Sequence, residues 1–330
     1  MNAEELLQEY RSGRTEFTGV SLVGAGLAGA DLIGIDFSKA DLRRANLLFA
    51  FLHKGNLTKA QLQGAKLAGA LLNQAVLMSA DLSEAQLQGA SLQRANLMCA
   101  QMPLANLSDA NLREADLRSV NLRGANLRGI ILRSASLRAE RGYNASDLQR
   151  VDLRRADLRG ANFNEADLSE ADLSGADLKE ANFLKVNLQG ANLSGCNLQG
   201  ATLAEVNLED GVLAGADLRG ANVSRINALR ANFQGADLSR VSATKANFSG
   251  ADLNSVSLQG ANLLGANLSR ANLIGANLRE VNLVDADLVR TNLQDADLTQ
   301  AILERAELSG AYLFGTILHG ATMPDGSTHA

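Results

Sequence analysis

The sequence has no tryptophan and only two prolines, two cysteines and three histidines among its 330 residues. Aromatic residues make up 4% of the chain and hydrophobic residues 46%, so a buried core has to be built mainly from leucine and alanine. Because His53, His319 and His329 are scattered, the sequence offers no plausible Ser-His-Asp or Cys-His set. We therefore expect no catalytic residues and no enzyme.

Long apolar stretches and a strong charge of one sign are also absent. The N-terminal region contains Glu4, Glu5 and Glu9 and no apolar segment typical of an export signal, and no later segment offers the roughly eighteen successive apolar residues of a membrane span. The net charge of −5 is small for this length and gives no indication of nucleic-acid binding. These features predict a cytoplasmic protein without a membrane or nucleic-acid partner.

What the sequence does contain is a five-residue period. From Phe17 to Leu137, Leu or occasionally Phe or Met stands at every fifth residue, with a small residue, usually Ala, two positions earlier and often Asp or Asn between them. After Leu137 the next such residue is Leu148, eleven positions later, and the period then continues through Leu318 and Met323. We interpret this phase slip as one residue inserted in the segment 139–147.

Each unit, Ala-(Asp/Asn)-Leu-x-x, predicts a short extended piece followed by a turn. Residues two apart in an extended chain share a face, so Ala and Leu point inward while Asp or Asn points outward. Gly, Asn, Asp and Ser at the turn positions tolerate tight or left-handed backbone, which lets the chain bend in every unit. Successive coils can then stack with backbone pairing at a spacing of roughly 4.8 Å.

These tandem units resemble those of the pentapeptide-repeat family over about residues 15–323. The resemblance implies an all-β fold, a right-handed quadrilateral parallel β-helix with four units in each coil, about fifteen coils and a rod on the order of 75 Å long. The opening Glu-Glu-Leu-Leu at 4–7 and the ending Met-Pro-Asp-Gly at 323–326 are similar to those of cytosolic members from cyanobacteria.

The N-terminal segment 1–14 is predicted to be a helical cap. Asn2 as the N-cap residue and Glu5 three residues later form a capping-box pattern, and residues 3–11 are expected to be helical. Leu6, Leu7 and Tyr10 would close the first coil, whose core and backbone groups need a cover. The predicted domains are thus the cap at 1–14, the β-helix at 15–323 and a C-terminal tail at 324–330.

Two kinds of residue that could carry chemistry are better explained by the repeat itself. Asp before the core Leu, as at Asp147, is replaced by Asn at Asn187 and Asn207, which fits a hydrogen-bonding turn residue and not a calcium ligand. Cys196 occupies an inward Ala position, and Cys99 lies at a turn without a His or Lys neighbour in sequence. We expect no disulfide, no metal site and no cofactor.

One irregularity in the repeat is a run of arginines, each of which follows the core Leu of consecutive units. With four units in a coil they would wind around the rod as a basic collar, which borders a segment at 160–180 with six carboxylates and one Lys. The collar is either a solvated surface with local ion pairs or a docking site for an acidic partner. Its members are Arg113, Arg118, Arg123, Arg128, Arg133 and Arg138.

A further irregularity is the phase slip at 139–147, which lies inside this basic region. One interpretation is a tolerated bulge. The other is a bulge that kinks the rod and presents Tyr143 to a partner.

Apolar side chains at outward positions form the last irregularity. Phe51 and Leu71 are twenty residues apart, as are Met78 and Met98, so four units in a coil would stack each pair. A contiguous exposed apolar patch indicates a partner or dimer interface, whereas scattered hydrophobic residues need no explanation. The candidate partner-binding residues are Phe49, Phe51, Leu71, Met78, Met98 and Leu104.

Two functions from different classes fit these features. The first is a non-catalytic protein-protein interaction scaffold or regulator, which binds a protein partner, or a second copy in a homodimer, through a face of the rod. The alternative, implied by quinolone-resistance members of the family that this chain resembles, is a DNA mimic that modulates a type II topoisomerase, DNA gyrase. Mimicry of DNA needs acidic faces, and 31 basic residues against 36 acidic ones favour the scaffold.

Overall fold

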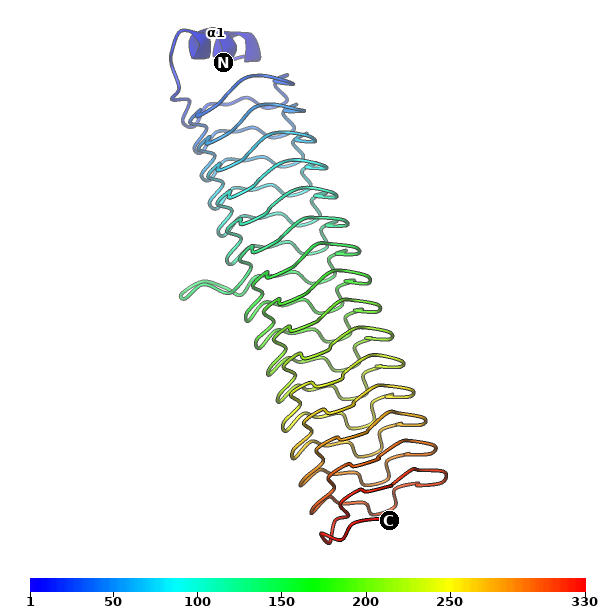
Figure 1. The fold of residues 1–330 in the computed structure, drawn as a ribbon. Helices are drawn as coiled ribbons and strands as arrows, with labels where there is room; N and C mark the ends of the chain where they lie inside the picture. Colours follow the sequence, from blue (N-terminus) through cyan, green and yellow to red (C-terminus); the bar gives the residue numbers. More distant parts are fainter. The chain divides into compact units, whose positions relative to one another are not determined.

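The computed structural model describes residues 1–330 as two compact units, Met1–Asp167 and Leu168–Ala330. Each unit by itself is a stack of coils (Figure 1). The chain contains a single helix, α1, at Ala3–Arg11, and its β-structure consists of isolated bridging residues. No helix of the protein has the length and apolar character needed to cross a membrane.

Neighbouring coils pair in parallel register, twenty residues apart. Phe51 bridges Leu71 in the first unit, and Asn192 bridges Val212 in the second. Backbone hydrogen bonds accompany each bridge; the Leu52 N–H, for example, donates to the Leu71 carbonyl at 2.8 Å. A separation of twenty residues places four five-residue units between paired positions, so each extended piece lies beside the one four units later.

The core of both units consists of the inward Leu and Ala side chains. Leu57 and Ala60 in the first unit, and Leu193 and Ala191 in the second, are at most 1% exposed. Phenylalanine replaces the core Leu without leaving the interior at Phe17, Phe37, Phe163, Phe183, Phe233 and Phe248. The inward direction of the Leu and Ala positions is therefore confirmed for these coils.

The Asp or Asn between Ala and Leu stabilises the turn that follows it. The Thr58 N–H donates to Oδ1 of Asn56 at 3.1 Å, which is the local hydrogen bond of an Asx turn. Asparagines in successive coils also bond to one another, as where Nδ2 of Asn227 donates to Oδ1 of Asn207 at 3.0 Å. These side-chain oxygens act as hydrogen-bond acceptors for the turn and the ladder, as the exchange of Asp for Asn predicted.

The last residue of most units adopts the left-handed backbone conformation. Gly190 does so with a φ of 65°, but Arg94 and Glu114 do so as well, with φ values of 55° and 57°. Side chains longer than the small ones expected from the sequence thus occupy many turns. The conformation costs a residue with a β-carbon about 1–2 kcal/mol. The cross-coil bond from the Arg94 N–H to the Arg113 carbonyl, at 3.0 Å, holds the turn in this conformation.

Helix α1 covers the first coil as predicted. Oδ1 of Asn2 accepts from the Glu5 N–H at 2.9 Å, and the Glu5 carboxylate accepts from the Asn2 N–H at 3.1 Å, which completes the capping box. Leu6 is fully buried, and the Tyr10 hydroxyl donates to the Ile33 carbonyl at 2.8 Å. The helix therefore shields apolar core and satisfies one carbonyl group at this end.

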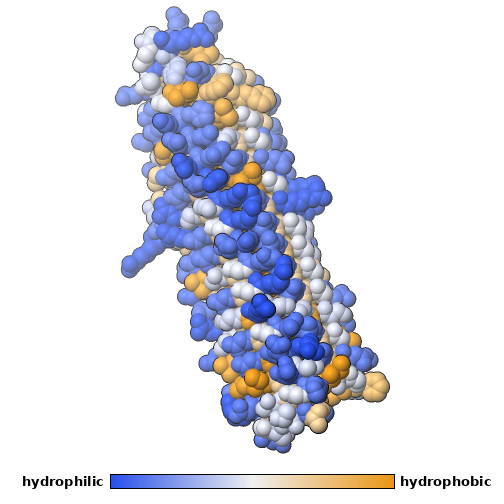
Figure 2. All heavy atoms as spheres, in the orientation of Figure 1, coloured by the Kyte–Doolittle hydropathy of each residue, from blue (hydrophilic) through white to orange (hydrophobic).

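The last coil of the second unit is less well covered. Leu313 occupies the inward Leu position and is nevertheless 38% exposed, because no further coil lies over it. A short antiparallel pairing of Thr322 with Thr328 folds the final residues back on the chain. Hydrophobic side chains gather near this end of the second unit, and another group lies close to α1 in the first unit (Figure 2).

The phase slip forms a loop that leaves the wall of the first unit (Figure 1). Asn121 bridges Asp147, so the two are 26 residues apart and not twenty, and six residues lie outside the regular coil. The interpretation of a single inserted residue is therefore wrong. A one-residue bulge would leave Asp147 out of register with Asn121, whereas looping out one whole unit plus the extra residue restores the pairing.

Removing the loop should leave the fold of the first unit intact. Deletion of residues 140–145 joins Ala139 to Ser146, which is fully buried at an inward Ala position, and thereby restores the five-residue spacing between Leu137 and Leu148. Combining it with Ala139→Gly avoids the cost of about 1 kcal/mol for a left-handed alanine. We expect an unchanged far-ultraviolet circular dichroism spectrum and a melting temperature at or above that of the full chain. If thermal unfolding of this variant were no longer cooperative, the register described here would be wrong.

Candidate functional site

The histidines and cysteines do not form a reactive site. His53 lies in the first unit, while His319 and His329 lie in the last part of the second. Burial raises the pKa of the Cys196 thiol to about 12, and this thiol donates a hydrogen bond to the Leu173 carbonyl. Burial also raises the pKa of the half-buried Cys99, although Arg118 opposes the shift. Neither thiol is activated as a nucleophile.

Three of the six apolar candidate residues come together on the first unit. Phe51 and Leu71 lie side by side through their parallel bridge, and Phe51 is 41% exposed. Phe49, two residues before Phe51, is 65% exposed, and its ring lies so close over Gly69 that a β-carbon there would collide with it. Phe49, Phe51 and Leu71 therefore form a small apolar surface on two neighbouring coils, which we call the apolar strip.

The other three candidates lie elsewhere on the coil. Met78 and Met98 occupy neighbouring coils, where the Ser79 N–H donates to the Met98 carbonyl, and both side chains are half-buried. The twenty-residue register puts Met98 about half a coil away from the Phe49 position. Leu104 is 66% exposed at a different turn. The structure thus brings three candidates together and separates them from Met78, Met98 and Leu104.

The collar arginines occupy the turns of successive units, and most of them bind neighbouring carboxylates. Arg123 pairs with Asp147 at 3.0 Å, Arg133 pairs with Asp157, and Arg128 has no ion pair. The remaining ion pairs are Arg113 with Glu114, Arg118 with Asp116 and Glu140, and Arg138 with Glu140. Local ion pairs therefore compensate much of the positive charge of the collar.

Glu140 ties the base of the loop to the wall. Arg118 and Arg138, which lie in neighbouring coils, both bind its carboxylate, and its N–H donates to Oγ of Ser119 at 3.1 Å. Desolvation acts to raise the pKa of Glu140, but the hydrogen bond from Arg118 and the nearby positive charges hold it below its ordinary value. The ion pairs of the Glu140 carboxylate are therefore fully present above the ordinary pKa of a glutamate. They are lost as the pH falls through the lowered pKa of Glu140. Tyr143, at the tip of the loop, is 57% exposed.

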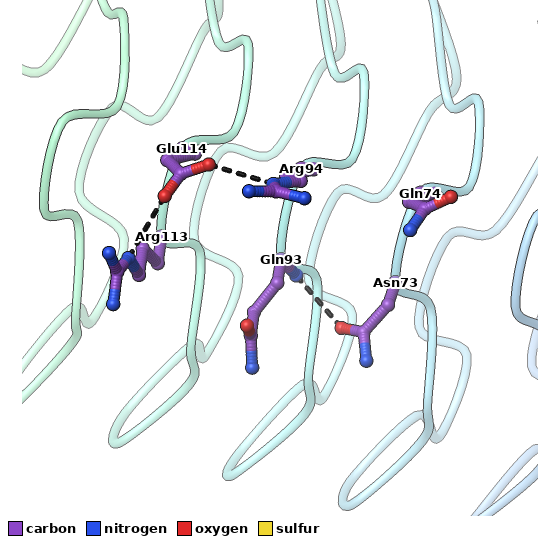
Figure 3. Close-up of a pocket in the computed structure, with 6 residues that line it drawn as sticks. All are labelled: Asn73, Gln74, Gln93, Arg94, Arg113 and Glu114. Carbon is purple, nitrogen blue, oxygen red and sulfur yellow. Dashed lines mark hydrogen bonds and ion pairs between the residues drawn. The ribbon is translucent and has the colours of Figure 1, made fainter.

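A polar groove of about 400 Å³ lies along one row of turns in the first unit (Figure 3). Its lining side chains come from three successive coils, with one row formed by Asn73, Gln93 and Arg113 and a second by Gln74, Arg94 and Glu114. Glu114 lies between the two arginines and accepts from Nε of Arg94 at 2.7 Å and from Nε of Arg113 at 3.1 Å.

The groove was not predicted from the sequence, although the sequence contains a signal for it. Residues 73, 93 and 113 are spaced by twenty, as are residues 74, 94 and 114, and all six are polar. The five-residue period places Arg113 in the collar, which follows the chain around the coil. The row is visible in the sequence at a spacing of twenty residues and not at a spacing of five.

The sequence model of one protein family, described as pentapeptide repeats, matches nearly the whole chain. The matched segments are 21–58, 56–94, 100–138, 146–184, 187–225, 212–250, 231–269, 251–295 and 291–325. A comparison with curated protein sequences gave no match.

Solved structures include several similar chains. HetL, a pentapeptide repeat protein involved in heterocyst differentiation regulation from the cyanobacterium Nostoc sp. strain PCC 7120, is 31% identical over 100% of both chains, with a TM-score of 0.23. Rfr23 from the cyanobacterium Cyanothece 51142 is 37% identical over 28% of this chain and 64% of its own, with a TM-score of 0.27. QnrB1, a plasmid-mediated fluoroquinolone resistance protein, is 23% identical over 50% of this chain and 85% of its own, with a TM-score of 0.45.

Proposed function

Since this chain belongs to the pentapeptide repeat family, whose members form right-handed β-helix solenoids without enzymatic activity, we propose that it is a scaffold or regulator that binds a protein partner through the apolar strip of its first unit. The protein is not an enzyme and acts through non-catalytic interactions. Within that role, the partner and the surface that binds it are the subject of the proposal.

The exposed aromatic rings of the apolar strip support the proposal best. Phe49 and Phe51 stand where most other units place Asp, Asn, Ser, Gln, Gly or a charged residue, and both rings remain in contact with solvent. Folding of the chain alone gains little from them. Aromatic side chains are enriched at the cores of protein interfaces, where burial against a partner supplies most of the binding energy.

The double variant Phe49→Ser/Phe51→Asn should lose partner binding while it keeps its stability. Both side chains are exposed, so their replacement should change the melting temperature little. A pull-down from the source cells and sedimentation velocity would measure partner capture and self-association. Phe314→Ser is the matched control, because Phe314 is 67% exposed in the second unit. Unimpaired capture and self-association by the double variant would refute the strip as the binding surface.

The proposal extends to the architecture and location of the protein. We place residues 15–323 in one four-sided repeat domain of about fifteen coils, preceded by the cap at 1–14 and followed by a tail at 324–330. A cytoplasmic location is part of the same proposal. A homodimer that buries the apolar strip is one form that the proposed interaction can take.

The alternative function, a DNA mimic that modulates DNA gyrase, requires a surface of unpaired negative charge. In the second unit Asp217 binds Arg219 at 2.6 Å, and Asp210 and Glu209 both bind Arg230. Such pairs reduce the negative potential that a mimic of DNA needs. We therefore expect DNA gyrase supercoiling to be unaffected by micromolar amounts of this protein in a gel assay. Strong inhibition, or protection of gyrase from a quinolone, would favour the alternative.

A further inference from the structure

A row of basic and polar side chains runs beside the apolar strip. We call it the basic ridge and define it by Lys54, Asn73, Gln74, Gln93, Arg94 and Arg113. Cross-coil bonds make the row continuous: the Lys54 N–H donates to the Asn73 carbonyl at 3.0 Å, the Gln74 N–H to the Gln93 carbonyl at 2.9 Å, and the Arg94 N–H to the Arg113 carbonyl at 3.0 Å. Most of this ridge lines the groove of Figure 3.

Several side chains of the basic ridge have hydrogen-bonding groups that no other group of the protein uses. The side-chain amides of Gln74 and Gln93 make no hydrogen bond within the protein, and the Arg94 and Arg113 side chains are 66% and 56% exposed. Each arginine uses only Nε on Glu114, which leaves the terminal nitrogens of both guanidinium groups available. A guanidinium group binds a carboxylate through two parallel hydrogen bonds, so these groups suit an acidic ligand.

The ridge and the apolar strip adjoin in the same coils. Asn73 follows Leu71 by two residues, and Lys54 follows Phe51 by three. The positions in line with Phe51 and Leu71 in the next two coils are Ser91 and Asn111, so no carboxylate separates the strip from the ridge there. Lys54, Arg94 and Arg113 carry three positive charges, and one carboxylate, that of Glu114, binds the two arginines, so the ridge with Glu114 has a positive balance.

From this juxtaposition we propose that the first unit binds an acidic segment of a protein partner, whose apolar side chains contact the strip and whose carboxylates contact the ridge. The proposal rests on the proposed function and names the chemistry of its partner. A nucleic acid fits less well, because its phosphate backbone offers the apolar strip no apolar side chains to contact. Aromatic side chains and arginine are enriched together at protein interfaces.

Fluorescence anisotropy with the full-length protein tests the proposal. The probe is a short fluorescein-labelled peptide of Asp and Glu interspersed with Leu and Phe, compared with a peptide in which Lys replaces the acidic residues, and with duplex DNA. We expect the acidic peptide alone to bind, with an affinity that falls as salt is added. Arg94→Glu/Arg113→Glu should weaken binding by about tenfold or more. Glu is compatible with both positions, because Glu84 and Glu209 occupy the corresponding turns of other coils.

The matched control is Arg44→Glu/Lys59→Glu, which changes the net charge equally at exposed turns away from the ridge. The proposal is overturned if the acidic peptide does not bind, if both double variants weaken it equally, or if Arg94→Glu/Arg113→Glu binds as tightly as the unchanged protein. Tighter binding of duplex DNA, lost in Arg94→Glu/Arg113→Glu, would assign the ridge to nucleic acid. Partner capture that survives loss of the ridge but not of Phe49 and Phe51 would leave the proposed scaffold function standing without the ridge.

Discussion

Leu193→Lys should destabilise the second unit more than any surface substitution. Leu193 is fully buried, and its amide donates to the Val212 carbonyl of the next coil at 2.7 Å. The substitution removes about 1.5–3 kcal/mol of apolar burial and forces an ammonium group to be desolvated or to lose its proton. We expect a large fall in the melting temperature, or complete loss of the folded second unit, when thermal unfolding is followed by circular dichroism.

The control for this variant is Gln189→Lys, four residues earlier. Gln189 is exposed at a turn, so the same new side chain enters water and should change the free energy of unfolding by no more than about 0.5 kcal/mol. The pair compares inward with outward positions while holding the introduced residue constant. Similar melting temperatures for the two variants would show that the inward assignment of Leu193 is wrong.

Leu6→Asp should open the N-terminal end of the first unit. Leu6 is the fully buried residue of α1, and its loss exposes the core of the first coil to water. The change removes about 1.5–3 kcal/mol of burial and places a carboxylate against apolar side chains. We expect a lower melting temperature and increased self-association, because uncovered coil edges pair with other chains. Light scattering during thermal unfolding would measure both effects.

Gln8→Asp introduces the same charge on the exposed part of α1 and serves as the control. It should leave the melting temperature and the light scattering nearly unchanged, because Gln8 contacts solvent. If Leu6→Asp behaves like Gln8→Asp, the helix is not a cover for the first coil.

The repeat and its cap could be predicted from the sequence because each rests on local chemistry. The spacing of Ala and Leu fixes which side chains share a face, and a hydrogen bond between Asn2 and Glu5 needs only the first turn of α1. The length of the loop after Leu137 could not be predicted, for a related reason. A shift in a five-residue period shows only the residues left over after whole units are subtracted. It therefore indicates the one extra residue and not the complete unit that leaves the wall with it.

The surfaces could be predicted less well because they depend on which coils become neighbours. The twenty-residue spacing of Phe51 and Leu71 indicated their contact, and the bridge between them confirms it. Met98 and Phe49 lie about half a coil apart, so the prediction that they share one patch is wrong. The basic ridge combines Lys54, Arg94 and Arg113 with amides from intervening turns, and no continuous stretch of sequence contains it.

At the loop of residues 140–145, residues can be added to or removed from the chain without changing the number of coils in the first unit. Residues on both sides of it are fixed by pairing, Asn121 with Asp147 and Ser136 with Asn162, whatever lies between Leu137 and Ser146. Sequence at this position can therefore lengthen, shorten or diverge without a change in the coils that follow. The solenoid thus has an insertion site, at which a foreign peptide or an evolving recognition element can be presented on a rigid support.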